Sequence, residues 1–198
     1  MQEFWIWFST GLEHILDWNG YDHILYVMAL CVIFSSKEWK RLLVLITAFT
    51  IGHSLTLAAS VSGFITVKQY YIELLIPITI IATCLVNILL VKQNSEATKN
   101  TNYRLNYLLA LVFGFIHGMG FSYLLKSMLG KEESIVFPLL SFNLGLEAGQ
   151  LIIVFTMLLI SVFLARFTGF RKTIWVRTVS LGVLGISVFL FVQRLYDI

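Results

Sequence analysis

Long apolar runs separated by short polar segments dominate this chain. Six of them are long enough, or nearly so, to cross a bilayer, at residues 21–36, 41–61, 72–91, 103–125, 138–164 and 174–193. The hydrocarbon core is about 30 Å thick, so a helix of about 20 apolar residues spans it and satisfies its own backbone groups in lipid. The pattern therefore predicts an all-α integral membrane protein, with a bundle of about six transmembrane helices in a single domain over residues 1–198.

The segment before the first run is aromatic and too short to span. Phe4, Trp5, Trp7 and Phe8 suit the headgroup interface, where aromatic rings collect. We expect a short interfacial or half-inserted helix here, followed by a break at residues 17–20. A cleavable signal peptide is not expected, since no Lys or Arg precedes Lys37.

The composition agrees with a membrane protein and excludes several other classes. Hydrophobic residues make up 58% of the chain and charged residues 13%, whereas soluble domains have about 45–50% and about 25%. A net charge of +3 is too weak to predict nucleic acid as a partner, so membrane lipid is the expected surrounding. Cys31 and Cys84 both lie inside apolar runs, which excludes a disulfide framework.

The distribution of basic residues predicts the orientation. Ten of the 14 Lys and Arg residues fall in the loops after spans one, three and five, and four fall on the opposite side. Because cytoplasmic loops carry the excess of basic residues, both termini are expected to face away from the cytoplasm. A polar linker at residues 93–102 divides the chain into halves of three spans each.

A few polar residues remain inside the apolar runs, and they are the candidates for function. They include all four histidines, three acidic residues and several amides and hydroxyls. A charged side chain at the centre of a bilayer costs about 2.5–3.5 kcal/mol, so such residues face a cavity or one another. The candidates are His14, Asp22, His23, His53, His117 and Glu147, with Glu73, Thr50, Ser54, Asn143 and Gln150 as supporting residues.

Helical spacing groups these residues on shared faces. Asn143, Glu147 and Gln150 follow one another at i, i+4 and i+7 on span five, and Thr47, Thr50 and His53 form a comparable stripe on span two. Those faces should point into the bundle and bring His53, His117 and Glu147 together at similar depth.

Two further patterns concern spans two and four. A weak echo relates Phe49-x-x-x-His53 to Phe113-x-x-x-His117, on spans that would run in the same direction. Gly114, Gly118 and Gly120 around His117 would let another helix approach closely. The glycines are therefore expected to act in packing.

Imidazoles and carboxylates converging in a low-dielectric bundle suit a borderline divalent cation such as Ni²⁺, Co²⁺ or Zn²⁺. Thiol and thioether ligands would favour Cu⁺, and oxygen ligands alone would favour Mg²⁺ or Ca²⁺. The residues predict a transition metal held by nitrogen and oxygen, without naming it.

Four segments together resemble the HupE/UreJ family of small integral membrane proteins. They are His14-x5-Gly20-Tyr21-Asp22-His23, Phe49-Thr50-Ile51-Gly52-His53-Ser54-Leu55-Thr56-Leu57, Phe113-Gly114-Phe115-Ile116-His117-Gly118-Met119-Gly120-Phe121 and Phe142-Asn143-Leu144-Gly145-Leu146-Glu147-Ala148-Gly149-Gln150. Glu73 with Asn87 resembles a further position of the family.

The resemblance implies a hydrogenase or urease accessory membrane protein that takes up nickel or cobalt. By that resemblance, His14, Asp22, His23, His53, His117 and Glu147 would handle the metal in a bacterial cytoplasmic (inner) membrane, and a metalloenzyme maturation system would be the partner. The chain has no His-rich tail to capture metal first.

The same residues leave other interpretations open. A membrane-embedded zinc hydrolase could use the cluster, with Glu147 as general base, and a non-transporting assembly factor is a third class. Individually, Asp22 could cap a helix, His14 could sit at the interface as a tolerated polar ring, His53 and His117 could hydrogen-bond neighbouring helices, and Glu147 could relay protons.

Overall fold

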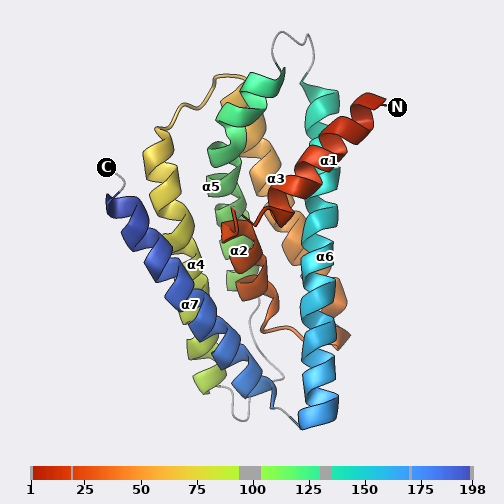
Figure 1. The fold of residues 1–198 in the computed structure, drawn as a ribbon, viewed down its shortest axis with the longest axis vertical. Coiled ribbons are helices and arrows are strands. Elements are labelled where there is room, and N and C mark those ends of the chain that lie inside the picture. The colour runs from red at the N-terminus through yellow and green to blue at the C-terminus, as the bar shows by residue number, and fades with distance from the viewer. Residues whose placement is uncertain (1, 19, 94–103, 130–134, 170, 197–198) are drawn as a thin grey trace.

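Helices account for nearly all of the chain in the computed structural model, which describes residues 2–18, 20–93, 104–129, 135–169 and 171–196 (Figure 1). Within these ranges there is no strand. The elements are α1 (Gln2–Leu16), α2 (Asp22–Cys31), a 3-10 turn (Ser36–Glu38), α3 (Trp39–Val61), α4 (Gln69–Gln93), α5 (Arg104–Leu129), α6 (Val136–Thr168) and α7 (Lys172–Tyr196). The prediction of an all-α bundle is confirmed. The predicted polar linker lies almost wholly outside the described residues.

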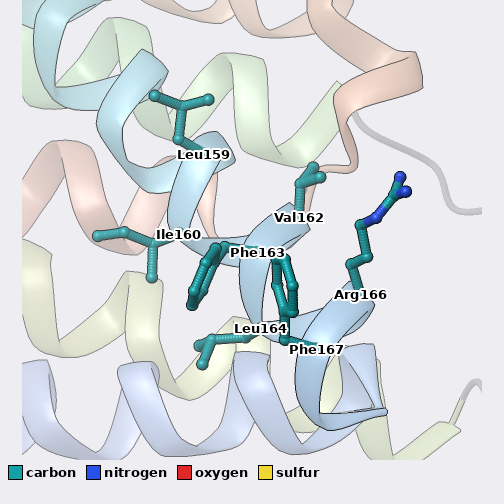
Figure 2. A pocket seen from close by; sticks show the side chains of 7 residues that line it. All are labelled: Leu159, Ile160, Val162, Phe163, Leu164, Arg166 and Phe167. Atoms are coloured by element: carbon teal, nitrogen blue, oxygen red, sulfur yellow. The ribbon is translucent and has the colours of Figure 1, made fainter.

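Five helices, α3 to α7, are long and apolar enough to cross a membrane. Their outer faces carry large exposed hydrophobic side chains, as an integral membrane protein requires. Figure 2 shows one such face near the end of α6, where Leu159, Phe163 and Phe167 border a shallow hollow that is almost entirely apolar. Arg166 lies beside it, close to the end of the helix.

The structure differs from the prediction at the first span. In place of one helix over residues 21–36 there is the ten-residue α2, about 15 Å long and half the thickness of the hydrocarbon core. In Figure 1, α1 runs obliquely down to the middle of the molecule and α2 continues from there. Only the short α2 thus stands where a full span was expected, and the break predicted near Gly20 separates it from α1.

Helix α1 is packed lengthwise against α6, a contact that the prediction of an interfacial or half-inserted helix did not include. A Cβ on Gly11 would collide with the carbonyl of Phe142, and one on Gly145 would collide with the carbonyl of Phe8. These two glycines bring the backbones into direct contact over two turns. Trp7, one of the aromatic residues of this segment, is buried and therefore takes part in helix packing.

A second glycine-mediated pair is formed by α3 and α5. A Cβ on Gly114 would collide with the carbonyl of Phe49, and one on Gly118 with the carbonyl of His53. Contacts that advance together along both helices mean that the two run parallel. The packing role predicted for these two glycines is confirmed, and the echo between the Phe-x-x-x-His segments corresponds to two helices lying side by side.

Helices α4 and α7 form the third closely packed pair, and α2 lies among all three pairs. Eight of its ten residues are buried. The side chain of Asn87 on α4 donates a hydrogen bond of 2.6 Å to the carbonyl of Ala29, in the last turn of α2. The surrounding helices thus hold the short helix by polar as well as apolar contacts.

Gly114→Ala tests the contact between α3 and α5. The added methyl group meets a backbone carbonyl that can move only with its helix, so we expect a loss of about 1–3 kcal/mol of stability. The thermal midpoint of the detergent-purified protein measures it. Gly182→Ala is the matched control, because a Cβ there meets nothing within 4 Å. Equal midpoints for the two variants would contradict the close packing.

Candidate functional site

Four histidine rings from four different helices converge next to the start of α2. The ring of His23 on α2 lies 4.4 Å from that of His14 on α1 and 4.5 Å from that of His117 on α5, measured between centroids. His53 on α3 lies 6.1 Å from His14. The convergence depends on the glycine contacts, because these bring α1 against α6 and α3 against α5.

Several nitrogen atoms of these rings are buried without a hydrogen-bond partner among the described residues. They are Nε2 of His14, Nε2 of His23 and both ring nitrogens of His53 and His117. Buried polar atoms are normally paired, so each such atom calls for an explanation. Hydrogen bonding between helices, the alternative for His53 and His117, receives no support from the described contacts of these rings. Their free lone pairs suit the binding of a cation.

Aromatic side chains enclose the histidines from the inner side of the bundle. Tyr26 stacks on Phe113 with centroids 3.5 Å apart, and Phe49 lies 5.3 Å from Tyr26. The ring of His117 sits 4.7 Å from Phe113. The cavity described next borders three of the four rings, those of His14, His23 and His117.

A cavity of about 540 Å³ opens beside three of the histidines, His14, His23 and His117. Three carboxylates, from Asp17, Asp22 and Glu73, contribute to its wall, as does one cationic side chain, that of Arg194. Carboxylates thus outnumber guanidinium groups three to one along the wall. Such a cavity attracts cations and raises their local concentration.

Asp22 uses both carboxylate oxygens. Oδ1 accepts a hydrogen bond of 2.9 Å from the backbone N–H of His23 and lies 3.0 Å from Nδ1 of the same residue. Oδ2 accepts one of 3.1 Å from Nη2 of Arg194. The carboxylate therefore satisfies an N–H in the first turn of α2, as the capping interpretation requires, and it also belongs to the cavity.

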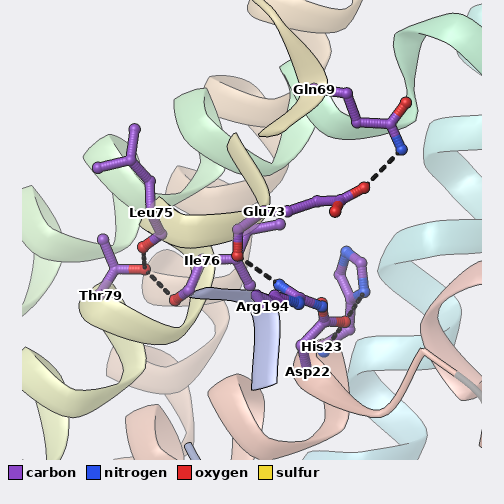
Figure 3. A network of polar contacts seen from close by, with 8 residues as sticks. All are labelled: Asp22, His23, Gln69, Glu73, Leu75, Ile76, Thr79 and Arg194. Atoms are coloured by element: carbon purple, nitrogen blue, oxygen red, sulfur yellow. Dashed lines mark hydrogen bonds and ion pairs between the residues drawn. The ribbon is translucent and has the colours of Figure 1, made fainter. Parts of the chain in front are cut away.

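Arg194 reaches the cavity from the last turn of α7 and is held there by α4 (Figure 3). Pro77 lies inside α4 and has no N–H, so the carbonyl of Glu73, four residues earlier, lacks its helical donor. Nη1 of Arg194 donates to that carbonyl at 2.6 Å. The carboxylate of Glu73 accepts a separate hydrogen bond of 2.6 Å from Gln69.

The profile of the family described as HupE / UreJ protein matches residues 1–194. The chain belongs to the HupE/UreJ family. Searches of curated proteins and of solved structures found no match. The family consists of membrane transporters or accessory proteins and is not known for enzymes. The fold described above is accordingly that of an integral membrane protein of the HupE/UreJ family.

Glu147 of this HupE/UreJ protein has its described contact on α3, away from the four rings. Oε1 accepts a hydrogen bond of 3.1 Å from Thr47, which precedes His53 by six residues, or about 9 Å of helix rise. Between them, Thr50 donates one of 3.2 Å to Gln150. The predicted stripes on spans two and five therefore face each other.

The other supporting residues of the HupE/UreJ chain are placed as follows. Ser54 donates to the carbonyl of Thr50 on its own helix at 2.6 Å, and Oδ1 of Asn143 is buried without a partner in the described part of the chain. Within that part, no three His, Cys, Asp or Glu side chains are already arranged as ligands of one metal ion. The histidine cluster gathers candidate donors without a finished coordination shell.

Sequence reasoning missed Arg194, Gln69 and Gln193 of the cavity wall. Arg194 was counted only as one of the basic residues that set orientation. Two signals could have found it: an Arg directly after the last apolar run, and a proline four residues after Glu73 that frees a carbonyl for an outside donor.

Proposed function

We propose that this protein takes up a divalent transition-metal cation, Ni²⁺ or Co²⁺, through the site formed by the histidine cluster and the acidic cavity. The observation that carries the proposal is the convergence of four imidazoles at the inner end of that cavity. Imidazole suits nickel, cobalt and zinc alike. The association of the family with nickel and cobalt favours these two metals over zinc.

The cavity would collect the cation and the histidines would receive it. Carboxylates of Asp17, Asp22 and Glu73 attract a hydrated ion, and His14, His23 and His117 border the same space. His53, which is fully buried behind them, would take the ion next. As the ion moves inward it loses water ligands, and imidazole nitrogens bind it in their place.

Further movement would follow the polar stripe between α3 and α6. From His53, the stripe continues through Thr50 with Gln150 and then Thr47 with Glu147. These oxygen atoms form weaker sites for a borderline metal than imidazole does, which favours release. In this proposal Glu147 serves a later step than the histidines, and it could exchange a proton for the metal.

Asp22→Asn, His117→Ala, His53→Ala and Glu147→Gln should each abolish metal accumulation in cells that express normal amounts of protein. Uptake of Ni²⁺ and Co²⁺ measured by elemental analysis of washed cells tests this. Glu13→Gln is the control, since Glu13 is an exposed carboxylate next to His14 in sequence and does not line the cavity. Unchanged uptake in both His53→Ala and Glu147→Gln would refute the transport route.

Purified protein distinguishes the other two classes. A zinc hydrolase would keep about one tightly bound Zn²⁺ per chain through purification, whereas a carrier loses its ion readily and moves it into liposomes. An assembly factor for a metalloenzyme would copurify with a maturation partner and show no flux. Either result would replace the transport proposal.

The orientation is part of the proposal, with both termini and the cavity facing away from the cytoplasm. Basic residues at the starts of α3, α5 and α7 gather at the lower end in Figure 1, opposite the N-terminus, as a cytoplasmic face would require.

Gln193→Cys should react with a membrane-impermeant maleimide in intact bacterial cells whose outer membrane admits the reagent. Gln193 is exposed and lies on the cavity wall. Thr173→Cys, exposed near the other end of α7, should react only after permeabilisation. Background should be low because Cys31 and Cys84 are 2% and 0% exposed. The reverse pattern would contradict the orientation.

A further inference from the structure

We propose that Arg194 is a built-in counter-ion that competes with the metal for Asp22 and so sets how tightly the cavity holds its ion. This inference rests on the proposed function. It assigns a role to a side chain that touches the carboxylate of the site and belongs to none of the motifs that identify the family.

The geometry places the guanidinium where an incoming cation would bind. One oxygen of Asp22 is occupied by the backbone and ring of His23, and the other accepts its hydrogen bond from Arg194. A divalent ion that coordinates Asp22 from the cavity must therefore share or take the second oxygen. An ion bound to this oxygen lies next to the guanidinium of Arg194, and the two positive charges repel each other.

The second contact of Arg194 keeps the guanidinium in place when Asp22 is taken. Nη1 bonds the Glu73 carbonyl that Pro77 has left without a helical donor. That bond does not involve Asp22. The side chain of Arg194 can therefore release Asp22 and remain in the cavity, bonded to the carbonyl of Glu73. The side chain is 23% exposed, which leaves it room to shift.

Such an arrangement suits a carrier better than a storage site. With the cavity empty, the guanidinium compensates the buried charge of Asp22, which would otherwise be costly. With the metal bound, the same guanidinium stays beside the carboxylate, and its positive charge lowers the affinity of the site for the metal. Transport needs a site weak enough to release its ion.

The test is the affinity of the purified, full-length chain for Ni²⁺, measured by calorimetric titration. Arg194→Gln and Arg194→Met should each bind Ni²⁺ about tenfold or more tightly than wild type, because both remove the repelling charge. Arg194→Lys keeps the charge and should stay close to wild type. Arg177→Gln, an exposed arginine at the opposite end of α7, is the matched control and should change nothing.

A double variant isolates the role of the carboxylate. In an Asp22→Asn background, Arg194→Gln should no longer strengthen binding, since the contested oxygen is gone. A purely structural role for Arg194 predicts the opposite of the main result, namely weaker binding in the neutral variants because Asp22 loses its support.

The outcomes separate this inference from the proposed function. Wild-type protein that binds no Ni²⁺ or Co²⁺ would overturn both. Wild-type binding with unchanged or weaker affinity in the neutral variants would overturn the counter-ion role alone. Neutral variants that fail to give monodisperse protein, while Arg194→Lys does, would show that Arg194 is needed for folding and would also count against it.

Discussion

A helix that stops half-way across a bilayer must have its ends satisfied by other side chains, and the short helix α2 imposes this requirement on the whole molecule. Lipid offers no hydrogen bonds, so free N–H and C=O groups at a buried helix end are costly. At one end of α2, Asp22 accepts from the N–H of His23; at the other, Asn87 donates to the carbonyl of Ala29. The break that creates these ends also creates a polar site inside an apolar bundle.

The close helix pairs follow from the same requirement. The helices around α2 pack in pairs at backbone distance, which brings them close around it. Gly11 and Gly145 allow this for α1 and α6, and Gly114 and Gly118 allow it for α3 and α5. His14 lies three residues from Gly11, His117 lies next to Gly118, and His53 lies next to Gly52, which also contacts the backbone of α5, so the packing of these helices and the convergence of their rings have one cause.

Much of the fold could be predicted because apolar runs longer than a bilayer is thick have few alternatives to a helix. Helices α3 to α7 lie where those runs predicted them. The first run is the exception, since its apolar pattern does not show that α2 ends at Cys31. Likewise, an aromatic segment of fifteen residues suits an interface as well as it suits packing along another helix, and only Gly11, facing Gly145 across the pair, distinguishes the two.

The candidate site was predictable in its residues and less so in its arrangement. The high cost of polar groups in lipid pointed to the histidines and to Asp22, and these do come together. The same argument could not show that Glu147 faces Thr47, because helical spacing gives the face of a residue and leaves its partner open. It also could not find Arg194, whose position depends on a carbonyl freed by Pro77 on a different helix.

The position of His53, which is fully buried next to an acidic cavity, has a physical consequence for an ion taken up there. Asp17, Asp22 and Glu73 line the cavity, where water and, for Asp22, the guanidinium of Arg194 offset their charge, whereas His53 is fully buried. A carboxylate at the depth of His53 would have no water to offset its charge, and its attraction for a divalent ion would be strong enough to slow release. Imidazole can be uncharged without an ion and still offers a strong nitrogen donor to nickel or cobalt. In the proposed transport, charged groups at the cavity and an uncharged donor at His53 would therefore allow a cation to be attracted from water and passed inward without a deep electrostatic trap.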